Sequence, residues 1–131
     1  MKIEHVAFNV ADPRAVAKWY VENLGMRIVR KGDGPQWGHF LADSSGQSVI
    51  EIYHNDTVPT PDYASMAQVT LHLALVSRDV AADRQRLLAA GATAEGEIFK
   101  SGEDEIASMR DPWGFPIQLA RRAKPLSLRS Q

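Results

Sequence analysis

Residues 3–12 read Ile-Glu-His-Val-Ala-Phe-Asn-Val-Ala-Asp, and this stretch decides the fold. Apolar side chains occupy alternate positions from Val6 onward, which is typical of a strand with one buried face. Asp12 and Pro13 then indicate the start of a helix, because an Asp carboxylate accepts hydrogen bonds from free helix amides and Pro fits the first helical position. The sequence therefore predicts a strand that leads directly into a helix.

The same arrangement returns 67 residues later, at residues 70–79, which read Thr-Leu-His-Leu-Ala-Leu-Val-Ser-Arg-Asp. In each half a helical pattern follows and ends at a glycine, Gly25 or Gly91. Three strand-like segments come next in both halves, at residues 26–30, 37–42 and 48–54 and at residues 94–99, 105–110 and 115–120. The order β-α-β-β-β thus occurs twice, which predicts an α+β fold of two tandem βαβββ modules.

We expect one domain of 131 residues, in which residues 1–54 form the first module and residues 68–121 the second. The connector, residues 55–67, lacks hydrophobic periodicity and contains two prolines. Residues 122–131 read as a basic, flexible tail. A ferredoxin-like domain with two helices and four strands is the alternative, which the larger number of strand-like segments disfavours.

The composition excludes several classes of function. With 15 basic and 16 acidic residues, the formal charge of −1 favours neither nucleic acid nor an anionic membrane as a partner. The absence of cysteine excludes disulfides, thiolate nucleophiles and cysteine-based zinc sites. No segment has the length of a membrane span and the N-terminus lacks the pattern of a signal peptide, so we expect a cytoplasmic protein.

Four polar residues interrupt the apolar strands: His5, Glu51, His72 and Gln118. The two histidines are 67 residues apart, and so are Glu51 and Gln118. Each half therefore carries a histidine in its first strand and an oxygen donor in its last strand. Strand alternation points all four side chains away from their apolar neighbours, so they can line a common sheet surface.

Taken singly, each of these residues is more simply explained as a hydrogen-bonded or solvated side chain. Their matched spacing favours a shared site. Two imidazoles, a carboxylate and an amide oxygen suit one divalent ion such as Zn²⁺, Ni²⁺, Mn²⁺ or Fe²⁺. Four protein ligands around an octahedral ion leave two positions for water or substrate, as catalysis requires.

The sequence also resembles the vicinal oxygen chelate superfamily, which comprises glyoxalase, bleomycin-resistance and extradiol dioxygenase proteins. The resemblance runs from Ile3 to Ala120, and its most telling segments are residues 5–12, 19–20, 24–26, 111–114 and 118–119. It implies a cup-shaped mixed sheet with the helices outside and a divalent metal at the inner face. In glyoxalase I-like members the metal ligands come from the positions of His5, Glu51, His72 and Gln118.

The resemblance implies a metal-dependent lyase or isomerase of the glyoxalase I type, with glutathione as a co-substrate and a homodimer as the assembly. Bacterial members usually carry Glu where this chain has Gln118, and an amide cannot act as a general base. Glu51 is then the candidate catalytic base, moving a proton next to a substrate carbonyl. An Fe²⁺ extradiol-type dioxygenase and a non-catalytic drug-binding protein of the bleomycin-resistance type are the alternatives.

Five further residues are weaker candidates for substrate contacts. Four of them fall on strands or turns where they can line the cup, and the fifth can pair with a substrate carboxylate. Packing between strands, a subunit interface or a structural ion pair explains them equally well. They are Trp37, His39, Tyr53, Met109 and, for the carboxylate, Arg110.

Overall fold

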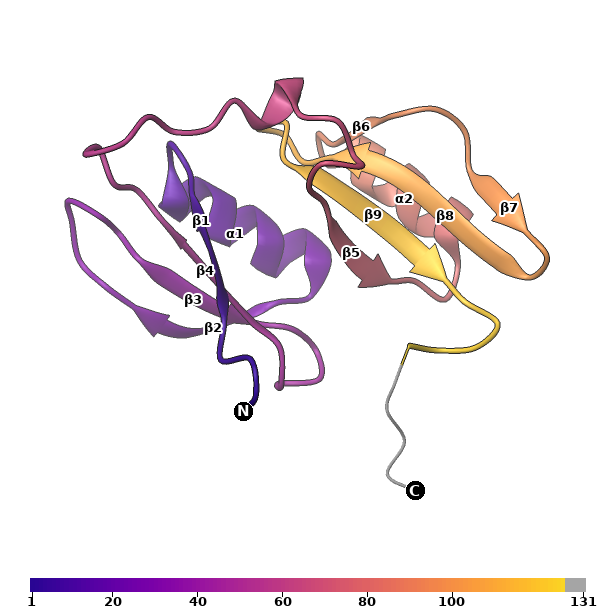
Figure 1. Cartoon of the computed structure of the whole chain (residues 1–131), viewed down its shortest axis with the longest axis horizontal. Coiled ribbons are helices and arrows are strands. Elements are labelled where there is room, and N and C mark those ends of the chain that lie inside the picture. Colours follow the sequence, from indigo (N-terminus) through magenta and orange to yellow (C-terminus); the bar gives the residue numbers. More distant parts are fainter. Residues whose placement is uncertain (127–131) are drawn as a thin grey trace. The chain divides into compact units, whose positions relative to one another are not determined.

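The computed structural model describes residues 1–126 and divides the chain into two compact units, Met1–Pro61 and Asp62–Gln131. The division falls within residues 55–67, the connector expected from the sequence. Of the tail expected at residues 122–131, the last five lie outside the described residues. Each unit is described by itself (Figure 1).

The first unit has one helix on a four-stranded mixed sheet. The sheet has the order β1-β4-β3-β2, in which β1 runs parallel to β4 and the other neighbours are antiparallel. The elements are β1 (Val6–Asn9), α1 (Pro13–Leu24), β2 (Arg27–Lys31), β3 (His39–Ala42) and β4 (Val49–Tyr53). This is the β-α-β-β-β order predicted for the first half.

The second unit repeats the plan, with its own mixed sheet of order β5-β9-β8-β6 and with β7 also paired to β8. Here β5 runs parallel to β9. The elements are η1 (Tyr63–Ser65), β5 (Leu73–Val76), α2 (Val80–Ala89), β6 (Thr93–Ala94), β7 (Phe99–Ser101), β8 (Asp104–Arg110) and β9 (Pro116–Arg121). The α+β class and the duplicated arrangement are therefore confirmed.

One predicted strand is wrong in detail. Residues 94–99 are not a single strand but contain the end of β6 and the start of β7, both paired antiparallel to β8. Gly96 lies between them at φ +75°, a left-handed conformation that interrupts an extended chain. The second sheet thus has one more strand segment than the first (Figure 1).

Both helices begin where the sequence indicates. The Asp12 carboxylate accepts a hydrogen bond from the amide of Ala15 at 3.2 Å, and Asp79 accepts one from Ala82 at 3.0 Å. Each cap satisfies one of the amides that a helix leaves free at its start. Because each helix follows the first strand of its unit closely, these caps also fix where that strand ends.

Alternating apolar residues fix the orientation of both sheets. In the first unit Leu41 and Ile52 are fully buried on the face that α1 covers, and in the second unit Met109 and Ile117 are buried on the face that α2 covers. Side chains at intervening positions point to the other face of each sheet. We call this second surface of each sheet its open face.

The turn between β8 and β9 is held by the buried carboxylate of Asp111. Its Oδ1 accepts hydrogen bonds from the amides of Trp113 at 3.0 Å and Phe115 at 2.8 Å. The amide of Gly114 donates to the Asp111 carbonyl at 2.9 Å. The Asp-Pro-Trp-Gly turn expected from the sequence is therefore present, and it sets the register in which β9 returns along β8.

Candidate metal centre

The first unit brings His5 and Glu51 together. His5 directly precedes β1, and Glu51 lies in β4 opposite Ala7. Imidazole Nε2 of His5 is 3.2 Å from carboxylate Oε2 of Glu51. Two donors bonded to one ion at about 2.1 Å lie roughly 3.0–3.4 Å apart, so this spacing fits joint coordination of one cation.

The neighbours of His5 hold its ring in this orientation. Nδ1 lies 3.0 Å from carboxylate Oε1 of Glu4, to which it donates. The ring of Phe40 meets the imidazole edge to face, with centroids 5.3 Å apart and planes at 82°. A histidine that uses one ring nitrogen on a carboxylate presents the other nitrogen as a ligand, which is a common arrangement around protein-bound metals.

The second unit offers an equivalent pair, His72 and Gln118. Nδ1 of His72 donates to the backbone carbonyl of Gln68 at 2.7 Å, which leaves Nε2 as its ligating atom. Nε2 of Gln118 donates to Oγ of Ser108 at 3.4 Å, so the amide oxygen is the atom left to face a ligand. These donor atoms also suit a divalent cation.

The strand registers show that the two pairs occupy equivalent positions. In the first unit Glu51 pairs with Ala7, two residues after His5; in the second, Gln118 pairs with Ala74, two residues after His72. Both oxygen donors lie on the open face of their sheet, because the residues on either side of each are buried. The offset of 67 residues therefore reflects the same place in two copies of one fold.

Within residues 1–126, no three His, Cys, Asp or Glu side chains gather closely enough to hold a metal ion. Each unit by itself supplies two donors, one of which is an amide in the second unit. The candidate centre therefore consists of two half-sites, and a four-ligand site at these residues stays a prediction.

Among the substrate candidates, Tyr53 shares the open face with Glu51, two residues further along β4. Arg110 lies on the same face of its sheet as Gln118, but its guanidinium is already engaged. It donates to the carbonyls of Tyr63, Gly114 and Met66 and forms an ion pair with Glu95 at 3.1 Å. This is the structural ion pair that the sequence also allows for Arg110.

His39 and Met109 lie on the opposite, helix-covered faces. His39 pairs with Ile52 and Met109 with Ile117, both buried, so strand alternation turns these two side chains away from Glu51 and Gln118. Met109 is fully buried and His39 is 3% exposed. The expectation that they line the open face is corrected: Met109 is a core residue, and His39 faces α1.

Trp37 lies in the turn before β3 with φ +50°, an uncommon conformation for a bulky residue. The guanidinium carbon of Arg14 lies 4.1 Å from the centre of its indole ring. This cation–π contact attaches the turn to α1. Trp37 therefore belongs, with His39, to the surroundings of the helix and not to the face that bears Glu51.

Sequence reasoning missed four residues that orient the ligand candidates: Glu4, Phe40, Gln68 and Ser108. The sequence could have indicated two of them by their closeness to a candidate ligand, because Glu4 directly precedes His5 and Gln68 lies four residues before His72. Phe40 and Ser108 become visible only through strand register, because each lies directly opposite the oxygen donor of its unit.

Glu95 is a carboxylate with a clear electrostatic perturbation in the second unit. Hydrogen bonds from the Gln68 side chain and from Arg110 hold the pKa of Glu95 below its usual value near 4.5. The same Gln68 side chain donates to the carbonyl of Met109 at 2.8 Å. This network fixes the segment that carries the Gln68 carbonyl, the hydrogen-bond acceptor of His72.

Two βαβββ modules, each with a histidine before its first strand and an oxygen donor in its last, define a class of small α+β proteins built from duplicated modules. Residues 2–119 match the model of the Glyoxalase/Bleomycin resistance protein/Dioxygenase superfamily. The chain belongs to this superfamily.

Curated relatives and a solved structure agree with that membership. The chain is 29% identical to a lactoylglutathione lyase of Haemophilus influenzae over 90% of both proteins. It is 30% identical to a probable lactoylglutathione lyase of Vibrio parahaemolyticus, over 90% of this chain and 88% of the relative. A glyoxalase I mutant from Zea mays superposes with a TM-score of 0.75 at 26% identity, over 94% of this chain and 46% of that one.

Within residues 1–126, neither helix has the length and apolar character needed to cross a bilayer.

Proposed function

We propose that this protein is a divalent-metal-dependent lyase or isomerase of the glyoxalase I type, which moves a proton at the carbon next to a carbonyl. The contact between His5 and Glu51 at 3.2 Å carries the proposal, because it joins a metal-type imidazole to a carboxylate that can accept a proton. The equivalent register of His72 and Gln118 and the similarity to lactoylglutathione lyases support it.

His5, Glu51, His72 and Gln118 would hold the ion. Glu4 and the Gln68 carbonyl keep both imidazoles in the tautomer that offers Nε2. A divalent ion in this setting supplies Lewis-acid polarisation of a carbonyl or hydroxyl oxygen. With a single anionic ligand, the donor set leaves positive charge available for an oxygen that becomes negative.

Glu51 would move the proton. Of the two oxygen donors only Glu51 can accept a proton, because an amide such as Gln118 is not a base near neutral pH. Its side chain is about one-quarter exposed, so a substrate can reach it from the open face. Glu51 would remove the proton from the hydroxyl-bearing carbon and return it to the adjacent carbonyl carbon, while the hydroxyl proton passes to the former carbonyl oxygen. The reaction is then an isomerisation that needs no other reactant.

The substrate class that fits is a 2-oxoaldehyde combined with a thiol as a hemithioacetal, in which a hydroxyl-bearing carbon lies next to a carbonyl. The names of the relatives make glutathione the first thiol to test. Proton transfer within this compound yields the thioester of a 2-hydroxy acid. We therefore propose glutathione as the co-substrate.

Metal analysis of the purified protein tests the site directly. We expect one equivalent of Zn, Ni, Mn or Fe after reconstitution, and loss of at least 90% of it in the combined His5→Ala and His72→Ala variant. His54→Ala is the matched control, because the Nδ1 of that histidine bonds to the carbonyl of Val10 and the residue is not a proposed ligand. The His54→Ala variant should keep one full equivalent of bound metal.

Parallel assays with the glutathione–methylglyoxal hemithioacetal and with a catechol then separate the enzyme classes. Turnover of the hemithioacetal supports the proposal, whereas cleavage of the catechol by the iron form indicates a dioxygenase. A protein that takes up no metal after reconstitution contradicts the proposal and favours non-catalytic ligand binding.

We also propose a homodimer. Large apolar side chains remain exposed near the edge strand β5, where Val69 and Val76 are each more than 90% exposed. A second copy of the chain can cover such a surface. Sedimentation equilibrium should give about twice the 14.5 kDa chain mass. A mass that stays at one chain up to 100 μM, roughly the upper end of ordinary working concentrations, would argue against the dimer.

A further inference from the structure

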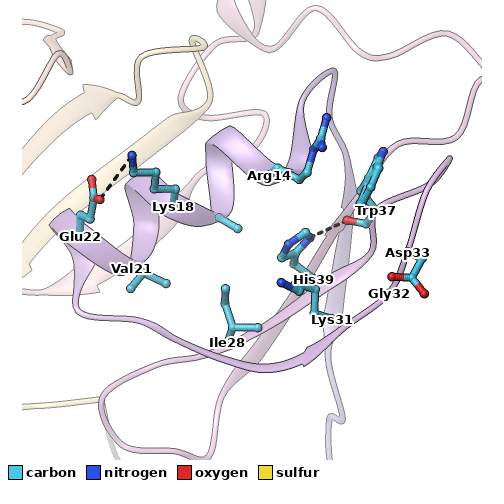
Figure 2. A pocket seen from close by; sticks show the side chains of 11 residues that line it. Arg14, Lys18, Val21, Glu22, Ile28, Lys31, Gly32, Asp33, Trp37 and His39 are labelled. Atoms are coloured by element: carbon cyan, nitrogen blue, oxygen red, sulfur yellow. Dashed lines mark hydrogen bonds and ion pairs between the residues drawn. The ribbon is translucent and has the colours of Figure 1, made fainter.

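A hollow of about 460 Å³ lies between α1, β2 and the turn before β3, on the helix-covered side of the first sheet. Its volume is within the range of small-molecule sites. Every residue that lines it belongs to the first unit. Figure 2 shows the side chains around it, with His39 and Lys31 together at the β-sheet wall.

A β-bulge places Lys31 in this wall. Ile28 pairs with Leu41, but Arg30 pairs with Phe40 and Lys31 with His39, so β2 contains one extra residue at Val29. Without the bulge, the side chain of Lys31 would lie on the face of the sheet opposite to Ile28. With the bulge, both side chains lie on the face that α1 packs against, and both residues remain exposed. Bulges often redirect a side chain at a functional site.

His39 is the second polar group of the wall, directly opposite Lys31 across the strand pair. It is 97% buried, since only 3% of its surface is exposed. Nδ1 donates to the carbonyl of Trp37 at 2.6 Å. No hydrogen-bond partner for Nε2 is found among the described residues, so this nitrogen is available to a molecule in the hollow.

The remaining lining is partly apolar and partly charged, with the cations of Arg14 and Lys18 and the carboxylates of Glu22 and Asp33. Ala17, Val21 and Ile28 supply apolar surface from the helix and from β2. At the rim Lys18 is only loosely paired with Glu22, at 3.9 Å. Lys31 has no ion-pair partner within residues 1–126, so its charge is available to an anion.

We infer that this hollow is a binding site for a small organic acid, with the apolar body between α1 and β2 and the carboxyl group on Lys31 and His39. Lys31 supplies positive charge to the carboxylate. Nε2 of His39 donates a hydrogen bond to the carboxylate when the imidazole carries a proton on both ring nitrogens. This site lies on the opposite face of the sheet from Glu51 and needs no metal ion.

The test uses 2-naphthoate as the probe and isothermal titration calorimetry of the full chain after chelation of metal. We expect one molecule bound per chain, and at least tenfold weaker binding of the neutral 2-naphthamide. Lys31→Met, which keeps an unbranched apolar stem, should raise the dissociation constant for 2-naphthoate at least tenfold. The combined His5→Ala and His72→Ala variant should bind 2-naphthoate as the parent does.

Arg30→Met is the matched control, because it removes the same charge from the adjacent residue of β2, which faces the other side of the sheet. Arg30→Met should change the dissociation constant for 2-naphthoate less than twofold. Val21→Trp, which fills the hollow from the helix side, should abolish binding and provides a second variant independent of charge. The inference is overturned by absence of binding at 10 mM, roughly ten-thousandfold above a micromolar dissociation constant. Equal losses in the Lys31 and Arg30 variants, or loss in the double-histidine variant, would also overturn it.

Discussion

Glu51→Gln is expected to lower kcat on the hemithioacetal by about 10²–10⁴-fold, which is the usual contribution of a positioned general base. The amide has nearly the same shape as the carboxylate and retains an oxygen that can contact a metal, but it cannot accept a proton. Gln118 cannot replace it for the same reason. Among the described residues, the other carboxylate that contacts His5 is Glu4, which bonds to Nδ1 and not to the proposed ligand atom Nε2.

The comparison must be made at equal metal content, since Glu51 is also a proposed ligand. Rates are therefore divided by the metal measured in each preparation. Glu51→Asp retains a base on a shorter stem, and its kcat should fall between those of the parent and the Gln variant. A Gln variant that turns over within about threefold of the parent, per metal ion, would show that the proton is carried by another group.

Local sequence signals were sufficient for the element order. Asp12 and Asp79 predicted both helix starts because capping depends on a side chain and an amide only three residues away. The strands were visible as alternating apolar residues, since each sheet buries one face. The division of residues 94–99 was missed because Gly96 interrupts the extended chain between two strand segments that both pair with β8.

The equivalent positions of the four polar residues were predictable because duplication supplied an internal comparison. A single strand histidine carries little information, but an offset of 67 shared by two pairs implies one position in two copies. The register bears this out at Ala7 and Ala74, which pair with the two oxygen donors. Whether the four side chains share one ion is a question of tertiary arrangement, and spacing along the chain does not determine it.

Side-chain direction was the weakest point of the sequence reasoning. The sequence pattern predicts that His39 lies on the same face of the sheet as Glu51. Glu51 pairs with Phe40, the next residue along β3, so the side chain of His39 lies on the opposite face. A shift of one residue moves a strand side chain to the other face of the sheet. The bulge at Val29 acts in the same way, since one extra residue moves Lys31 beside His39. The register of β3 on β4 and the register of β2 on β3 cannot be predicted from the sequence without knowing which strands pair.

Gly114→Ala is expected to destabilise the protein by about 2–5 kcal/mol, because two costs act together. Gly114 has φ +88°, a left-handed conformation that costs an L-residue roughly 1–2 kcal/mol. A Cβ there would also lie 2.6 Å from the Cβ and 2.9 Å from the Cα of Ala64, in η1. Such overpacking typically adds about 1–3 kcal/mol.

Gly96→Ala is the matched control, because Gly96 has φ +75° but a Cβ added there would meet no atom within 4 Å. Gly96→Ala should lower the free energy of unfolding only by the cost of the left-handed backbone conformation, roughly 1–2 kcal/mol. Urea unfolding followed by far-UV circular dichroism measures both free energies. If the two variants lose the same amount, the contact with Ala64 contributes nothing. A larger loss at Gly114 shows that η1 is packed tightly against the β8–β9 turn, the same turn that sets the register of Gln118 in β9.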